Sequence, residues 1–263
     1  MSYSIMMVLV FIFGLIVGSF LNVCIYRIPL KKSIVNPPSG CPGCGEGIRF
    51  YDNIPLLSFI ILGGKCRHCR QPISVRYPFI ELITGLLSLA VFIKYYPDYG
   101  QYLAFFIFVS ALVVISFIDL DHQIIPDSIS IPGIIAGFLV TTIFNIISAY
   151  PITWYDSLLG IIVGGGILYI VAIGYEKLTG KPGMGFGDVK LLAMIGAWMG
   201  WQAILFIILI SSLTGSIIGA AALLLSGKGL RTRIPFGPFL VLGTLIYLFF
   251  GIAIKNFYFN LFM

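Results

Sequence analysis

The sequence contains few charged residues: Asp, Glu, Lys and Arg together make up 10% of its 263 residues. Soluble domains usually carry about 25% charged residues, so this composition excludes an ordinary soluble enzyme. Hydrophobic residues make up 59% of the chain, and the mean hydropathy of +1.04 points the same way. We therefore expect a protein embedded in a lipid bilayer, with only a small soluble part.

Several common catalytic patterns are also missing. The chain has only two histidines, His68 and His122, and no H-E-x-x-H sequence, which excludes a metalloprotease of that type. No G-x-S-x-G is present, so the serine nucleophile of an α/β-hydrolase is excluded as well. These absences direct attention to the carboxylates of the chain.

Eight apolar segments predict an all-α polytopic membrane protein with about eight transmembrane helices. The segments are 4–23, 79–94, 101–118, 129–148, 157–175, 189–200, 202–225 and 236–254. No basic residue precedes the first segment and no small-residue cleavage site follows it, so we expect a transmembrane helix and not a cleaved signal peptide. The segment 189–200 is short for a full crossing and could be tilted or partly re-entrant.

Lysine and arginine are concentrated in a few connecting loops. Of the 16 basic residues, eight lie within 27–76, three within 177–190 and three within 228–233. If the chain starts outside, all of these loops fall in the cytoplasm, as the positive-inside rule requires. The net charge of +6 thus indicates membrane orientation, and we expect no nucleic-acid partner because the basic residues do not form one solvated face.

The loop 24–78 contains two C-x-x-C pairs. They are Cys41 with Cys44, and Cys66 with Cys69. Each pair turns the chain so that two thiolates face one tetrahedral ion, and two such pairs supply the four ligands of a structural zinc site. Two disulfides or a redox-active C-x-x-C are the alternatives, and a reducing cytoplasm disfavours disulfides. We predict a small cytoplasmic loop between the first two helices that zinc helps to fold, without metal catalysis.

Four aspartates lie at the predicted cytoplasmic ends of apolar segments: Asp119, Asp121, Asp127 and Asp188. Ionisable groups near membrane depth are costly and are therefore functional candidates. Asp127 could instead be the N-cap of the segment that follows it. Asp121 could simply be a solvated residue of the loop. Asp119 comes directly after an apolar run, so of these aspartates it is the one for which a purely structural or solvated role is hardest to argue.

Asp188 could also be an N-cap, but the glycines before it favour a functional interpretation. Gly185 and Gly187 remove side chains around the carboxylate and leave room for the backbone of a bound peptide. We interpret Asp119 and Asp188 as an aspartic protease dyad that shares one proton. One carboxylate takes a proton from water, and the other donates a proton to the scissile carbonyl.

Helix position predicts how the dyad divides its proton. Asp119 lies at the C-terminal end of a predicted helix, where the helix dipole disfavours a carboxylate, and Asp188 lies at an N-terminal end, where it is favoured. We therefore predict that Asp188 is ionised more readily and that Asp119 more often holds the shared proton. Lys190 either anchors the structure or binds an acidic side chain of the substrate.

The apolar segments and the cysteine loop together predict three parts of the chain. They are a first helix at 1–23, a zinc-binding loop at 24–78 and a peptidase domain with about seven helices at 79–263.

Six stretches of the sequence, in order, resemble the bacterial type IV prepilin peptidases, membrane aspartic proteases of the GxGD type. They are "GSFLNVCIYRIP" (18–29), the paired C-x-x-C loop, "RYPFIELITG" (76–85), "DLDHQIIPD" (119–127), "GFGDVKLLA" (185–193) and "IPFGPFL" (234–240). The stretches extend over nearly the whole chain. The combination is specific, although G-x-G-D alone also occurs in presenilin-like proteases.

The resemblance implies a bifunctional enzyme of the bacterial inner membrane. It would cleave the leader of prepilins or pseudopilins after a glycine at the cytoplasmic face, and would then methylate the new N-terminal residue with S-adenosylmethionine as co-substrate. It implies Asp119 and Asp188 as the catalytic pair. From their positions in the sequence, Gly185, Gly187, Asp121, Asp127 and Lys190 are candidates that support the site. The cysteines favour the bifunctional type. No G-x-G-x-G loop marks a binding site for the methyl donor, so that site stays unassigned. Arg76 and Glu81 are candidates for it without a supporting motif.

Two other classes remain open at the level of the sequence. An ion- or proton-coupled transporter would also carry aspartates at span ends, although the acids here cluster at one interface. A zinc-bearing membrane scaffold without enzymatic activity would leave the G-x-G-D segment unexplained. The sequence indicates neither the oligomeric state nor which pilins or pseudopilins are the substrates.

Overall fold

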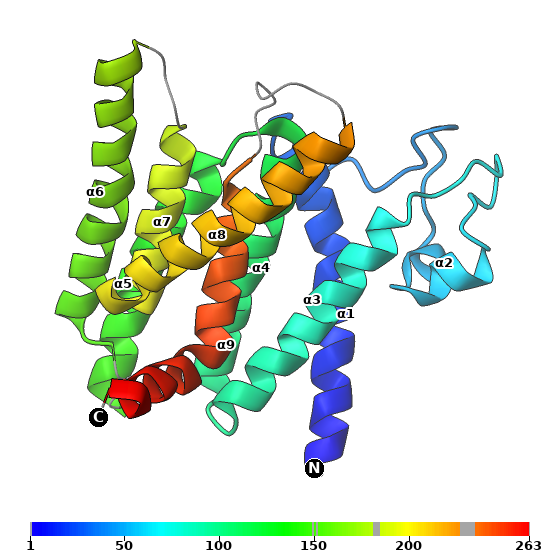
Figure 1. The fold of residues 1–263 in the computed structure, drawn as a ribbon. Coiled ribbons are helices and arrows are strands. Elements are labelled where there is room, and N and C mark those ends of the chain that lie inside the picture. The colour runs from blue at the N-terminus through cyan, green and yellow to red at the C-terminus, as the bar shows by residue number, and fades with distance from the viewer. Residues whose placement is uncertain (1, 149, 151, 181–184, 227–234, 263) are drawn as a thin grey trace. The chain divides into compact units, whose positions relative to one another are not determined.

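A computed structural model describes residues 2–148, 150, 152–180, 185–226 and 235–262, and every regular element in these ranges is helical (Figure 1). The long helices are α1 (Tyr3–Arg27), α3 (Arg76–Tyr95), α4 (Tyr99–His122), α5 (Asp127–Ser148), α6 (Trp154–Thr179), α7 (Phe186–Met199), α8 (Trp201–Ser226) and α9 (Gly237–Phe262). The loop between α1 and α3 holds a 3₁₀ turn, η1 (Phe50–Asn53), and the short helix α2 (Leu57–Ile61). The predicted all-α class is confirmed.

Within the described ranges, six helices are long and apolar enough to cross a membrane: α1, α3, α4, α5, α6 and α8. The shorter α7 has 14 residues. At about 1.5 Å per residue it extends roughly 21 Å, which is less than the ~30 Å thickness of the hydrocarbon core. This length agrees with the expectation that the segment 189–200 is short for a full crossing.

The chain divides into two compact units, Met1–Val114 and Ile115–Met263, and α4 contributes residues to both. In the first unit, α1 packs against α3, the blue and cyan helices of Figure 1. In the second unit, α5 and α6 pack against α7, and α8 packs against α9. The central element of the second unit is α7, because every residue from Leu191 to Met199 is buried.

Glycine allows α6 and α7 to approach closely. A Cβ atom on Gly160 of α6 would overlap the carbonyl oxygen of Gly196 in α7, and a Cβ atom on Gly196 would overlap the carbonyl oxygen of Gly160. Membrane helices pack mainly through van der Waals contacts, and small residues bring their backbones together. This contact fixes α7, and with it the segment that begins at Phe186.

Capping interactions at both ends of α6 explain why the helix begins at Trp154 and ends at Thr179. At its start, the Thr153 hydroxyl accepts a hydrogen bond from the Asp156 N–H at 3.3 Å, and the Thr153 N–H donates to the Asp156 carboxylate at 3.1 Å. This reciprocal pair is a capping box, which satisfies donors that the first helical turn leaves unpaired. At its end, Gly180 adopts a left-handed φ of 68° and its N–H bonds the Glu176 carbonyl. Glycine adopts this conformation without steric cost.

Candidate active site and metal centre

Asp119 lies in the last turn of α4 with its side chain turned into the protein, and the residue is 5% exposed. One of its carboxylate oxygens, Oδ2, accepts a hydrogen bond from the backbone N–H of Gly237 at 3.0 Å. Gly237 is the first residue of α9, so the carboxylate receives an N–H that this helix does not bond internally. A buried carboxylate is thereby held in one place by an element far away in the sequence.

Asp188 lies in the first turn of α7. The residue at the N-cap position is Gly185, so the alternative that Asp188 is itself the N-cap is not what the structure shows. The Asp188 and Asp119 carboxylates are close enough for their charges to interact. The structure thus brings together the two aspartates that the sequence analysis paired, one from α4 and one from α7.

The two glycines before Asp188 have different surroundings. A Cβ atom on Gly187 would lie 2.9 Å from the Cβ of Ile125, which is closer than real Cβ atoms approach one another. Gly187 therefore allows the start of α7 to pack against the segment between α4 and α5. Among the described residues, a Cβ atom on Gly185 would meet only the Gly187 nitrogen, at 3.9 Å. Of the two positions, only Gly185 leaves room of the kind expected for a substrate backbone.

The contact between Gly237 and Asp119 also bears on the proton of the dyad. The prediction for the shared proton rested only on the dipole of the helix to which each aspartate belongs. The structure adds the N-terminus of α9 at Asp119, and a hydrogen bond donated to a carboxylate favours its ionised form. This contact argues for an ionised Asp119, which is the reverse of the assignment predicted from the sequence.

Asp127 and Lys190 form an ion pair between the starts of α5 and α7. The distance from Lys190 Nζ to Asp127 Oδ1 is 2.7 Å, and the two side chains are 37% and 58% exposed. Asp127 is in the first helical turn of α5, and Asp121 is exposed in the last turn of α4. Of the two interpretations of Lys190, the contact supports the structural anchor.

The four paired cysteines gather at one point in the loop between α1 and α3. Their sulfurs all lie within 4.8 Å of one another, and Cys41 Sγ is 3.7 Å from Cys69 Sγ. A tetrahedral zinc ion bound at ~2.3 Å would hold its sulfur ligands about 3.8 Å apart. The thiols are free, so the disulfide alternative is not what the structure shows. The four-cysteine cluster has the composition and spacing of a metal site.

The backbone of the two C-x-x-C turns follows one pattern. The Gly45 N–H bonds the Cys41 carbonyl at 2.8 Å, and the Arg70 N–H bonds the Cys66 carbonyl at 3.1 Å. Gly45 and Arg70, each four residues after its first cysteine, both have a left-handed φ, of 73° and 59°. The two halves of the site are thus equivalent turns, as expected from the two matching sequence pairs.

Backbone N–H groups inside these turns favour the thiolate form of the first cysteine. Hydrogen bonds from the Cys44 and Gly43 backbone lower the pKa of Cys41 to about 6. Hydrogen bonds from the Cys69 and His68 backbone likewise lower the pKa of Cys66. Because the thiolate is the form that binds metal, the turns prepare the first cysteine of each pair for a cation.

A salt bridge joins the η1 turn to the second C-x-x-C pair. The Arg67 guanidinium donates to both carboxylate oxygens of Asp52, with an Nε to Oδ2 distance of 2.8 Å. The hydrogen bond from Arg67 lowers the pKa of Asp52 below its usual value. Through this bidentate pair the cysteine cluster also positions the segment 50–53.

The sequence reasoning missed Gly237 and Ile125. Both lie in stretches that it had noted for their resemblance, "IPFGPFL" and "DLDHQIIPD". A glycine directly before an apolar helix was the available signal, because a helix start offers free N–H groups to an anion. Its partner could not be named without the packing of α4 against the start of α9.

The fold and these two sites define a class: helical multi-pass membrane proteins with a pair of neighbouring carboxylates, of which Asp119 is buried, and a four-cysteine cluster. Within that class, the chain belongs to the type IV leader peptidase family. Residues 106–220 match that family, and residues 12–95 match the bacterial peptidase A24 N-terminal domain. This membership does not favour the transporter alternative.

Several relatives carry the name prepilin leader peptidase/N-methyltransferase. The protein of Aeromonas hydrophila is 39% identical over 97% of this chain and 94% of its own length. The protein of Pseudomonas aeruginosa is 39% identical over 93% of this chain and 90% of its own length. The protein of Myxococcus xanthus is 42% identical over 86% of this chain and 66% of its own length. No solved structure matches the chain.

Proposed function

We propose that this chain is a bifunctional enzyme of the bacterial inner membrane. It removes the leader peptide from type IV prepilins or pseudopilins after a glycine, and then methylates the new N-terminal residue. The single observation that supports the peptidase activity best is the pairing of Asp119 with Asp188 in a chain of the leader peptidase family. The methyltransferase activity is supported by the name that the relatives share.

The peptidase step needs no covalent intermediate. The ionised carboxylate, assigned to Asp119 because of the Gly237 N–H, takes a proton from water as the water oxygen attacks the scissile carbonyl carbon. Asp188 donates its proton to the carbonyl oxygen. The tetrahedral intermediate then collapses: the C–N bond breaks, and the proton that Asp119 received goes to the leaving amine. As the C=O bond forms again, one hydroxyl of the intermediate returns its proton to Asp188, which restores the dyad. General acid and base catalysis of this kind contributes about 10²–10⁴-fold each.

The methyl transfer requires S-adenosylmethionine as co-substrate. When bound, this molecule supplies a methyl group to the new terminal amine and leaves as S-adenosylhomocysteine, while the amine loses a proton. The chain's contribution is to bind the donor and to exclude competing water. The dyad of α4 and α7 takes no part in this step.

The cysteine cluster holds a structural zinc ion in this proposal. The 3.7 Å distance between Cys41 Sγ and Cys69 Sγ supports four-thiolate coordination. With four protein ligands the ion has no open position for a substrate, so it folds the loop and does not act in catalysis. The distribution of basic residues supports a cytoplasmic location for this loop and for the dyad.

Mass spectrometry of a co-expressed prepilin tests both activities at once. We expect a mature N-terminus that begins directly after a glycine and carries one added methyl group. Unprocessed prepilin would contradict the proposal as a whole. Cleaved but unmethylated prepilin would contradict only the methyltransferase half.

A further inference from the structure

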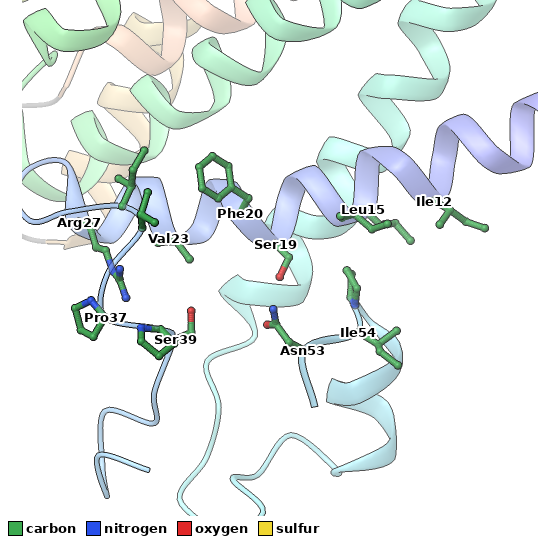
Figure 2. Close-up of a pocket in the computed structure, with 15 residues that line it drawn as sticks. Ile12, Leu15, Ser19, Phe20, Val23, Arg27, Pro37, Ser39, Asn53 and Ile54 are labelled. Carbon is green, nitrogen blue, oxygen red and sulfur yellow. The ribbon is translucent and has the colours of Figure 1, made fainter. Parts of the chain in front are cut away.

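The first unit contains a cleft that no part of the peptidase mechanism uses. It measures about 720 Å³ and lies between the C-terminal half of α1 and the loop that carries the cysteines (Figure 2). This volume is within the range of about 300–1,000 Å³ that is typical of small-molecule sites. We propose that this cleft is the binding site of S-adenosylmethionine. The proposal rests on the methyltransferase half of the proposed function.

The polar side chains of the cleft come from three separate segments. Ser19 and Arg27 belong to α1, Ser39 precedes the first cysteine pair, and Asn53 ends the η1 turn. Figure 2 shows Ser19 and Asn53 facing one another across the cleft, with the Arg27 guanidinium beside Pro37. The rest of the lining is apolar, mostly aliphatic residues and prolines. A few converging polar groups on apolar walls are the usual composition of a small-molecule site.

This chemistry complements the parts of S-adenosylmethionine. Its α-carboxylate suits the Arg27 guanidinium, because arginine binds carboxylates through parallel charge-assisted hydrogen bonds. Its ribose hydroxyls and adenine edge suit the hydroxyls of Ser19 and Ser39 and the amide of Asn53. The adenine faces and the thioether carbons suit the apolar walls. Only one Arg27 nitrogen has a described partner within the chain, where Nη1 donates to the Ser33 carbonyl at 3.0 Å.

A buried acid lies directly behind the polar wall. Glu81 of α3 is 9% exposed, and its Oε2 accepts a hydrogen bond from the Leu56 N–H at 2.8 Å. The Ser19 side chain is also hydrogen-bonded to Glu81. Through this contact the Glu81 carboxyl group holds the Ser19 hydroxyl in place on the polar wall of the cleft. Glu81 therefore acts through Ser19 as a positioning residue.

The backbone beside the cleft is strained. Leu56 has a φ of 61° without being a glycine, and the residues before it, Ile54 and Pro55, line the cleft. Such a conformation costs roughly 1–3 kcal/mol and persists only where surrounding contacts enforce it. The bond from Leu56 N–H to Glu81 is one such contact. Strained residues cluster at active sites and ligand clamps, so the conformation of Leu56 supports a ligand site here.

An apolar helix or a lipid chain would fit this cleft less well. Neither offers groups that could bond Arg27, Ser39 and Asn53, and polar groups covered without a partner cost free energy. Arg76, one of the two bare candidates named from the sequence, does not line the cleft. Glu81, the other candidate, contacts it through Ser19.

Direct binding of labelled S-adenosylmethionine to the purified full-length protein in lipid nanodiscs tests the proposal. Two variants alter the cleft: Val23→Trp fills it, and Arg27→Gln removes its charge without adding volume. Two matched controls make the same changes elsewhere. Val8→Trp lies on the same helix, at a residue that is 58% exposed and outside the cleft, and Arg49→Gln removes an exposed guanidinium that bonds Tyr51.

We expect each cleft variant to raise the dissociation constant at least about tenfold, the loss equivalent to about 1.4 kcal/mol. The controls should change it by less than about twofold, as is usual for surface substitutions. The methylated fraction of cleaved prepilin should fall in parallel. Binding is compared among variants that retain their metal content, and Arg27→Gln decides the matter if Val23→Trp fails to fold.

The possible failures are distinguishable. If the unaltered protein binds the donor and methylates prepilin while both cleft variants bind as tightly, the donor site lies elsewhere and the proposed function stands. If the unaltered protein cleaves prepilin but binds no donor, the methyltransferase half of the function and the cleft assignment are both wrong. If a lipid copurifies in the cleft and the donor does not displace it, the cleft is a lipid site and the assignment is wrong.

Discussion

Gly237 connects two sites of the chain that are 118 residues apart, because its backbone N–H bonds the Asp119 carboxylate. A side chain at this position has no space: a Cβ atom would lie 2.6 Å from Asp119 Oδ2. The peptidase site is therefore sensitive to a residue that carries no functional group. This places α9 in the active site although it contributes only backbone.

Gly237→Ala tests that sensitivity. The new methyl group must displace the Asp119 carboxylate, and a shift near 1 Å in a catalytic group can lower the rate about 10²-fold. Gly174→Ala in α6 is the matched control, since a Cβ atom there meets nothing within 4 Å. We expect a large loss of prepilin cleavage in the first variant and near-normal cleavage in the second. Equal cleavage in both would show that the Gly237 contact does not position Asp119.

The pair Asp127–Lys190 is a second feature at the scale of residues. Both side chains are partly exposed, and exposed ion pairs typically contribute about 0.2–1 kcal/mol. A double-mutant cycle of Lys190→Gln and Asp127→Asn should give a coupling in that range for stability in detergent. If Lys190→Gln raises the KM for prepilin and Asp127→Asn does not, the hypothesis that Lys190 is a structural anchor is wrong.

At the scale of elements, the sequence located the helices well because the length of an apolar run is encoded locally. The predicted first span, 4–23, is α1 from Tyr3 to Arg27, and the short segment 189–200 is α7 from Phe186 to Met199. The site was harder to derive. Asp119 and Asp188 could be paired from their positions, but the Gly237 contact depends on how α9 begins beside α4, and local sequence does not encode it.

The same limit applies to Gly187. From the sequence we expected both glycines before Asp188 to make room for substrate, whereas Gly187 packs against Ile125. Only the tertiary contact distinguishes it from Gly185. The cysteine pairs were the opposite case, since each turn closes within six residues and its geometry follows from the local spacing.

The cysteine loop can be tested as an element. We expect one bound zinc per chain, and its loss in each of Cys41→Ser, Cys44→Ser, Cys66→Ser and Cys69→Ser, because a four-thiolate site needs all its ligands. Cys24→Ser is the matched control, since Cys24 is buried in α1 and outside the cluster. Elemental analysis of the purified proteins measures the metal. Zinc retained in any of the four variants would contradict four-cysteine coordination.

At the scale of the whole molecule, the basic loops predict which side of the membrane each connection occupies. Gly100, next to the start of α4, should lie outside, and Thr179, at the end of α6, should lie in the cytoplasm. A membrane-impermeant maleimide should therefore label Gly100→Cys in intact cells and Thr179→Cys only after lysis. Labelling of Thr179→Cys in intact cells would overturn the orientation and place the dyad on the wrong side for a cytoplasmic leader.

The central claim is that Asp119 and Asp188 together cleave the prepilin leader, and prepilin cleavage by four Asp→Asn variants tests it most directly. Asp119→Asn and Asp188→Asn should each lower the rate at least about 10²-fold, because each removes one of the two proton-transfer groups. Asp121→Asn and Asp127→Asn should retain cleavage, since both residues are exposed. Near-normal cleavage in either of the first two variants would contradict the account.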